Sequence, residues 1–88
     1  MIRVAICNDH EMVREALAGV IAHEEGIEVV GATDTMATTM DLVDMEDPDV
    51  LVVDVRRQNE SGLDVARSVI AKHPKIKIVV LTSFNCDD

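Results

Sequence analysis

Polar residues stand at the ends of three apolar segments, and their types could support cation binding and phosphoryl transfer. Asn8-Asp9-His10 follows the segment IRVAIC, Asp54 lies within VLVVDV, and Thr82 follows IKIVVL. A carboxylate in a segment as apolar as VLVVDV is costly to bury unless a cation, a phosphoryl group or a backbone donor compensates it. Asp54 is therefore the most informative of these residues, and a loop-capping role is its structural alternative.

Asp9 and Asn8 could complete a site for a hard cation beside Asp54. Mg²⁺ in proteins is typically held by one or two carboxylates, with water and phosphate oxygens completing its shell. Asp9 would supply the second carboxylate, and Asn8 an oxygen that acts through water. Both have structural alternatives, because Asp is a favoured helix N-cap and Asn is common in turns. The Thr82 hydroxyl could bond a phosphoryl oxygen on Asp54, although a β-branched residue at a strand end needs no functional explanation.

The elements that must position these residues alternate between strand and helix. Apolar segments predict strands over 2–7, 27–32, 50–55 and 76–81. Helical spacing predicts a helix over about 11–23 and a weaker second helix that Pro48 stops. A capping box formed by Ser61 and Asp64 opens the third helix. The strand over 50–55 is almost wholly apolar, as expected of a strand that is buried on both faces.

Two of the predicted helices carry apolar stripes that should face the sheet. The first helix places six residues at this spacing: Met12, Val13, Ala16, Leu17, Val20 and Ile21. The third helix has an inner stripe of four: Leu63, Ala66, Val69 and Ile70. The acidic residues between 41 and 49 should form a solvated surface, and the histidines should lie at the surface without forming a ligand set.

The alternation predicts an α/β fold with a parallel sheet and right-handed crossovers. Ligands of such sheets bind outside the carboxyl ends of the strands. If the first, third and fourth strands are neighbours, Asp9, Asp54 and Thr82 converge at one edge.

Composition and missing motifs exclude several classes of protein. The net charge of −9 over 88 residues opposes direct nucleic-acid binding, which needs a basic face. No apolar run approaches the length of a membrane span. Cys7 and Cys86 give neither a disulfide framework nor a metal-ligand spacing, so the cytoplasm is the default compartment. The chain has no P-loop, dinucleotide fingerprint or nucleophile elbow, and we expect it not to be an enzyme.

Taken together, these residues resemble the receiver domain of two-component response regulators. The resemblance rests on NDH after the first strand, VVDV with Asp54, Gly62 eight residues later, and LTSF at the fourth strand. The phrases IEVVGATD, PDVLVVDV, SGLDVA and IVVLTSF are typical of the subfamily with a C-terminal LuxR-type helix-turn-helix. The resemblance covers residues 1–88 and implies a flavodoxin-like, doubly wound sheet with strand order 2-1-3-4. It also implies an incomplete receiver that lacks the fifth βα unit and most of the fourth helix.

The resemblance implies a phosphoacceptor that works in a phosphorelay. Asp54 would take a phosphoryl group from a histidine kinase, and Thr82 would hydrogen-bond that group. Mg²⁺ would be bound directly by Asp9 and Asp54, by the backbone carbonyl of Arg56, and through water by Asn8. The parent protein would control transcription through a DNA-binding domain outside this chain.

Two departures from the family pattern support an alternative function. Asn8 stands where the family has a first acidic residue, so two carboxylates replace three, and Arg57-Gln58 replaces the usual Met-Pro. The alternative is a receiver-like, phosphorylation-independent interaction or dimerisation module in which Asp9 and Asp54 are structural. Under either interpretation the strand over 76–81 is an apolar edge with Lys77 as its only charge, which predicts self-association through that side.

Overall fold

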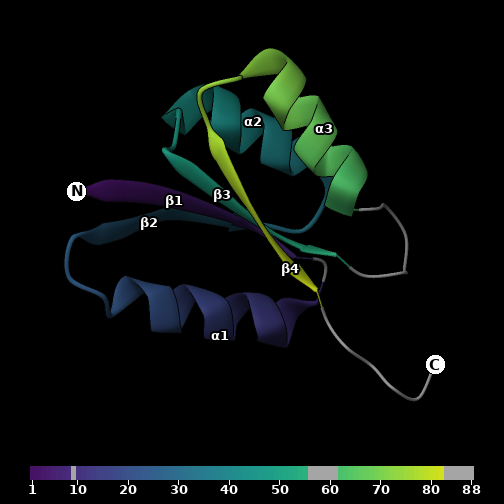
Figure 1. Ribbon diagram of the computed structural model, residues 1–88. Helices are drawn as coiled ribbons and strands as arrows, with labels where there is room; N and C mark the ends of the chain where they lie inside the picture. Colours follow the sequence, from purple (N-terminus) through teal and green to yellow (C-terminus); the bar gives the residue numbers. More distant parts are fainter. Residues whose placement is uncertain (9, 56–61, 83–88) are drawn as a thin grey trace.

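The computed structural model describes residues 1–8, 10–55 and 62–82, and at positions 54, 55, 62 and 82 it describes the backbone alone. Strands and helices alternate along these residues (Figure 1). The strands are β1 (Ile2–Cys7), β2 (Ile27–Thr33), β3 (Val50–Val55) and β4 (Lys77–Thr82). The helices are α1 (Glu11–Ala22), α2 (Met36–Glu46) and α3 (Gly62–Lys72).

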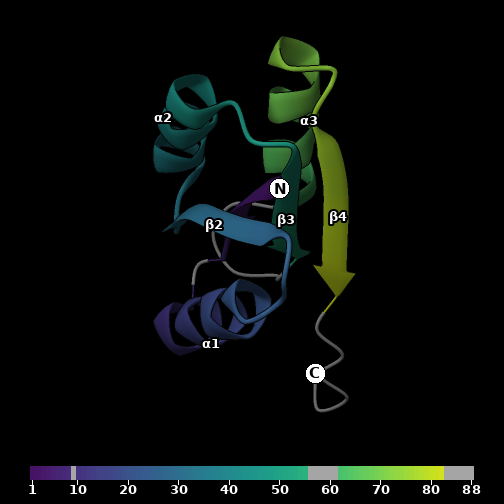
Figure 2. The ribbon, with the colours of Figure 1, turned by 90° about the vertical axis from the view of Figure 1, so that its left-hand side faces the viewer.

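The described strands form one parallel sheet in the order β2-β1-β3-β4. Helices α2 and α3 cover one face of the sheet, and α1 covers the other (Figure 2). Because β2 lies to one side of β1 and the later strands lie to the other, the chain winds in two directions from the centre. The predicted α/β fold, the parallel sheet and the strand order are confirmed.

Apolar side chains form a separate layer on each face of the sheet. The larger layer, under α2 and α3, buries Ala5, Cys7, Val43, Leu51, Val53, Val65, Val69 and Ile76. The smaller layer, under α1, buries Val4, Ile6 and Val52 against partly exposed residues such as Leu17 and Ile21. β3 contributes to both layers, so the prediction that this strand is buried on both faces is confirmed.

The predicted apolar stripes are wider than the surfaces that α1 and α3 bury. Met12 and Val20 of α1 are 75% and 67% exposed, and Leu63 and Ile70 of α3 are 48% and 47% exposed. The stripe prediction is therefore wrong at these positions and at Ala16, which is also exposed. A helix that lies on a sheet touches it along a narrow line, so residues on the flanks of an apolar stripe stay in contact with solvent. The residues of α3 that are buried are Val65, Ala66 and Val69.

Helix α2 begins with a capping box that was not predicted from the sequence. The Thr35 hydroxyl accepts the Thr38 N–H at 3.2 Å, and the Thr35 N–H donates to the Thr38 hydroxyl at 3.2 Å. The helix ends at Glu46, its C-cap residue Asp47 has a left-handed φ of 48°, and Pro48 follows, so the predicted stop is confirmed. The capping box predicted at Ser61 lies outside the described residues.

Three strand boundaries differ from the prediction by one residue, namely the end of β2 and both ends of β4. β4 begins at Lys77, because Ile76 belongs to the preceding turn and its N–H donates to the His73 carbonyl at 3.1 Å. β2 continues to Thr33, which pairs with Cys7 of β1.

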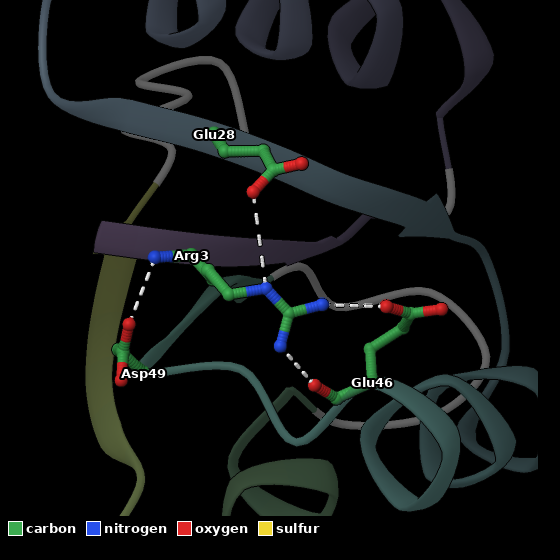
Figure 3. Close-up of polar contacts among 4 residues, drawn as sticks. All are labelled: Arg3, Glu28, Glu46 and Asp49. Atoms are coloured by element: carbon green, nitrogen blue, oxygen red, sulfur yellow. Dashed lines mark hydrogen bonds and ion pairs between the residues drawn. The ribbon is translucent and has the colours of Figure 1, made fainter. Parts of the chain in front are cut away.

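Arg3 joins β1 to its neighbours at the amino-terminal edge of the sheet (Figure 3). Its guanidinium lies 2.6 Å from the Glu46 carboxylate and also donates to the Glu46 carbonyl. The same guanidinium lies 3.9 Å from Glu28, and the Arg3 N–H donates to the Asp49 carboxylate at 2.9 Å. The solvated-surface prediction is therefore wrong for Glu46, which is partly buried against Arg3, while Asp49 stays exposed as predicted.

Asp44 links α2 to the end of α3. One of its carboxylate oxygens lies 2.7 Å from His73 Nε2, and the other accepts a hydrogen bond from Lys72 Nζ at 3.0 Å. These hydrogen bonds, first the one with His73, hold the pKa of Asp44 below its ordinary value. Asp44 itself stays exposed, so the solvated-surface prediction is confirmed for it, while His73 is half-buried rather than fully at the surface.

Candidate functional site

The sheet register brings the predicted site positions together at its carboxyl edge. Cys7 pairs with Val53, so residue 8 follows β1 beside residue 54 of β3. On the other side of β3, Asp54 pairs with Leu81, and Val55 pairs with Thr82. Backbone positions 54 and 82 therefore lie on neighbouring strands, and position 8 directly follows the strand on the other side of β3, which is the shared edge that the sequence predicted.

The predicted site residues are described to different extents. The structure places Asn8 in full and Asp54 and Thr82 by backbone, while Asp9 and Arg56 lie outside the described residues. The N-cap position of α1 is His10, one residue after Asp9, and its side chain makes no capping hydrogen bond. The roles of these residues in metal and phosphoryl binding stay predictions.

Asn8 is held from several directions and is 1% exposed. Its N–H donates to the Thr33 carbonyl at 2.9 Å, which extends the pairing of β1 with β2. Its Oδ1 accepts the His10 N–H at 2.6 Å, and its carbonyl accepts a hydrogen bond from Arg14 Nη1 at 2.9 Å. The contact with His10 is the turn that the sequence offered as the structural alternative for Asn8. Because an amide oxygen has two lone pairs, a contact with metal-bound water stays a prediction.

Threonine side chains beside this edge form a network that the sequence analysis missed. The Thr33 and Thr39 hydroxyls lie 2.6 Å apart, and Thr39 also donates to the Thr35 carbonyl at 2.6 Å. Because Thr39 donates its single proton to Thr35, the Thr33 hydroxyl is the donor to Thr39, and the Thr33 oxygen also lies 3.3 Å from the Ile6 carbonyl. Thr39 is 0% exposed, so this network ties the first turn of α2 to the ends of β1 and β2 inside the protein. The run Thr38-Thr39 in a helix was the available sequence signal.

The predicted ligands have the chemistry that Mg²⁺ prefers. They are two carboxylates and a backbone carbonyl, which are hard oxygen donors, and the backbone at positions 8 and 54 brings two of the contributing strands side by side. Among the residues that the structure describes, no three His, Cys, Asp or Glu side chains group as a metal site. Asp9 and Arg56 lie outside those residues and Asp54 is described by its backbone alone, so the predicted donor set rests on its chemistry and on the backbone register.

The sequence model of one protein family, the response regulator receiver domain, matches residues 4–88, which is nearly the whole chain. The chain belongs to the response regulator receiver family. Membership confirms the resemblance seen in the sequence and accounts for the flavodoxin-like order of the sheet.

Relatives and solved structures agree with this assignment. The chain is 32% identical to the DNA-binding transcriptional activator DevR/DosR of Mycobacterium tuberculosis, covering all of this chain and 41% of the relative. It is 35% identical to the transcriptional regulatory protein LiaR of Bacillus subtilis, covering all of this chain and 42% of the relative. This receiver therefore spans about two fifths of the length of these relatives.

A LuxR-family DNA-binding response regulator from Staphylococcus aureus has a similar structure, with a TM-score of 0.83 and 27% identity. The similarity covers 97% of this receiver and 71% of that chain. None of the helices in the described part of this receiver has both the length and the apolarity that a membrane span requires.

Proposed function

We propose that this receiver accepts a phosphoryl group on Asp54 from a sensor histidine kinase. Asp9 and Asp54 bind Mg²⁺ together with the Arg56 carbonyl, Asn8 contributes through water, and Thr82 hydrogen-bonds the phosphoryl group. The observation that supports the proposal is the register, in which β1, directly followed by position 8, and β4, which ends at position 82, flank the strand that carries Asp54. An acceptor, its cation ligands and a hydroxyl donor then share one edge of the sheet.

The chemistry is a displacement at phosphorus. A carboxylate oxygen of Asp54 attacks the phosphorus atom, the bond from phosphorus to the donor imidazole nitrogen breaks, and an acyl phosphate forms on Asp54. When bound, Mg²⁺ neutralises charge on the phosphoryl oxygens. The protein mainly positions the reactants, which suits an acceptor carried on the central strand β3.

Mass spectrometry tests this function directly. The chain is incubated with acetyl phosphate and Mg²⁺, and the intact mass and proteolytic peptides are measured. We expect one added phosphoryl group on the peptide that contains Asp54, removable by hydroxylamine as an acyl phosphate should be. A cooperatively folded chain that takes up no phosphate would contradict the proposal and favour the phosphorylation-independent interaction module.

The parent protein is proposed to be a cytoplasmic transcription regulator. Its relatives are a DNA-binding transcriptional activator and a transcriptional regulatory protein, and each is more than twice as long as this receiver. The net charge of −9 argues that DNA is bound by a region outside residues 1–88 and not by the receiver.

Replacing Asn8 with Asp is predicted to tighten Mg²⁺ binding by about tenfold, because it restores a third carboxylate beside Asp54. An Asp at position 8 can still accept the hydrogen bond from the His10 N–H, so the turn should persist. Calorimetric Mg²⁺ titration measures the change. Ala71→Asp, which adds the same charge at the exposed end of α3, serves as the control and should bind Mg²⁺ like the parent chain. Unchanged or weaker binding by Asn8→Asp would remove position 8 from the metal shell.

The chain is also proposed to associate with a second copy through β4. This strand pairs only with β3 among the described strands, and Val79 and Val80 are 44% and 41% exposed on its two faces. A long apolar edge strand offers unpaired backbone groups to another chain.

Sedimentation velocity across a concentration series measures this association. We expect the sedimentation coefficient to rise with concentration for the parent chain, and Val79→Lys to suppress the rise by charging the edge. Val20→Lys, on the exposed side of α1, should behave like the parent chain. A strictly monomeric parent chain would contradict the proposal, and suppression by Val20→Lys alone would move the contact to α1.

A further inference from the structure

We propose that Arg14 is a positioning residue for the cation site, because it holds the turn that carries Asp9. The inference rests on the proposed function, since the turn matters for chemistry only if Asp9 binds the metal. Arg14 lies in the first turn of α1, the helix that begins directly after Asn8-Asp9-His10.

Arg14 is tied to both residues that flank Asp9. Its guanidinium Nη1 donates to the Asn8 carbonyl at 2.9 Å, and its backbone N–H donates to the His10 carbonyl at 2.9 Å. The Asn8 side chain closes the same turn by accepting the His10 N–H. The second of these contacts, to the His10 carbonyl, is the first i to i−4 hydrogen bond of α1, so the contribution of the Arg14 side chain is its hold on the Asn8 carbonyl.

The opposite side of Asn8 is held by β2, where the Thr33 carbonyl accepts the Asn8 N–H. Arg14 and β2 therefore fix residue 8 from two sides, at the position beside Asp54 in the register. A long Arg side chain commonly extends its charged end into water. Here the guanidinium instead donates to a carbonyl of a residue that is 1% exposed, and Arg14 itself is partly buried. A charged donor on a buried carbonyl makes a strong hydrogen bond.

Charge and positioning predict opposite effects when Arg14 is replaced. A positive charge close to a cation site repels the cation, so an effect of charge alone would make Mg²⁺ bind more tightly once the guanidinium is removed. If Arg14 acts by holding the turn, its removal weakens Mg²⁺ binding despite the loss of that repulsion. The sign of the change therefore separates the two roles.

The experiment uses the whole chain with three substitutions. Arg14→Met removes the guanidinium and keeps much of the apolar stem. Arg14→Lys keeps the charge and a single donor but loses the planar group. Arg67→Met is the matched control, because Arg67 lies on α3, its side chain is 80% exposed, and it is 4.0 Å from Asp64. Calorimetry gives the Mg²⁺ affinity, and the rate of acetyl phosphate labelling is measured against Mg²⁺ concentration.

We expect Arg14→Met to lower the Mg²⁺ affinity about five- to tenfold, as for the loss of one charge-assisted hydrogen bond. Its labelling rate at saturating Mg²⁺ should stay within about twofold of the parent chain, because a positioning residue acts through the metal site and not on the reacting atoms. Arg14→Lys should give an intermediate affinity, and Arg67→Met should match the parent chain.

Unchanged or tighter Mg²⁺ binding by folded Arg14→Met overturns the inference while leaving the proposed function intact. If Arg14→Met does not fold, the Mg²⁺ affinity of Arg14→Lys is the test. An affinity equal to that of the unsubstituted chain then overturns the inference. A folded parent chain that binds no Mg²⁺ and takes no phosphate overturns both proposals.

Discussion

Asp54→Asn is expected to abolish phosphate incorporation from both a histidine kinase and acetyl phosphate. Residues 51–53 directly before Asp54 are 0–7% exposed, so β3 is a central, packed strand that presents position 54 at the site edge. An amide at this position lacks the anionic oxygen that the proposed attack on phosphorus requires, and it removes one of the two carboxylates of the proposed metal site. Intact-mass measurement after labelling, with peptide mapping, should show no phosphorylated species.

The matched control for this prediction is Asp64→Asn. Asp64 is an exposed carboxylate in the first turn of α3, and its loss removes the same charge without touching the carboxyl edge of β3. This variant should be labelled at the parental rate. Labelling of Asp54→Asn at the parental rate would overturn the assignment of the acceptor, and so would a labelled peptide elsewhere in the parent chain.

The fold was predictable because its signals are local and repeated. The apolar run at β3 and the amphipathic segments between the strands alternate in a way that few architectures allow. Periodicity shows which residues share a helix face, but it does not show how much of that face touches the sheet. Met12 and Val20 fit the stripe of α1 and yet are mostly exposed, since the contact between a helix and a sheet is narrower than the stripe.

Polar contacts between residues that are far apart in the chain could not be predicted from the sequence. Arg3 meets Glu46 and Asp49 across more than forty residues, and no local pattern marks such a pair. The composition of the acidic run indicated a solvated surface. A count of charges could not show that basic residues of other elements contact some of its carboxylates.

The candidate site, too, was predictable only in part. The residue types at positions 9, 54 and 82, together with the expected neighbouring strands, predicted a shared edge, and the register bears out that arrangement for the backbone at 54 and 82. The hydrogen bond from Arg14 to the Asn8 carbonyl was not predictable, because a side-chain contact with a backbone carbonyl depends on the path of the turn and leaves no mark in the residue types.

Ile6→Ala is expected to destabilise the receiver by about 2–5 kcal/mol, which is the range for removing a fully buried Ile side chain. Ile6 is 0% exposed and lies in the small layer under α1, where only Val4 and Val52 are also buried among the described residues. A chain of 88 residues has a free energy of unfolding of roughly 4–13 kcal/mol. The loss should therefore lower the unfolding midpoint by more than about 10 °C, as followed by circular dichroism.

Ile70→Ala is the control for that experiment, because it removes the same atoms from a side chain that is 47% exposed on α3. It should cost less than about 1 kcal/mol, as expected of a residue that already contacts water. α1 buries none of its own residues fully, so the layer beneath it depends on the few strand residues that it covers. Equal destabilisation by the two substitutions would show that the layer under α1 is not packed as a core. In that case α1 would be held in place by its turn at Asn8 and Arg14 instead of by apolar burial.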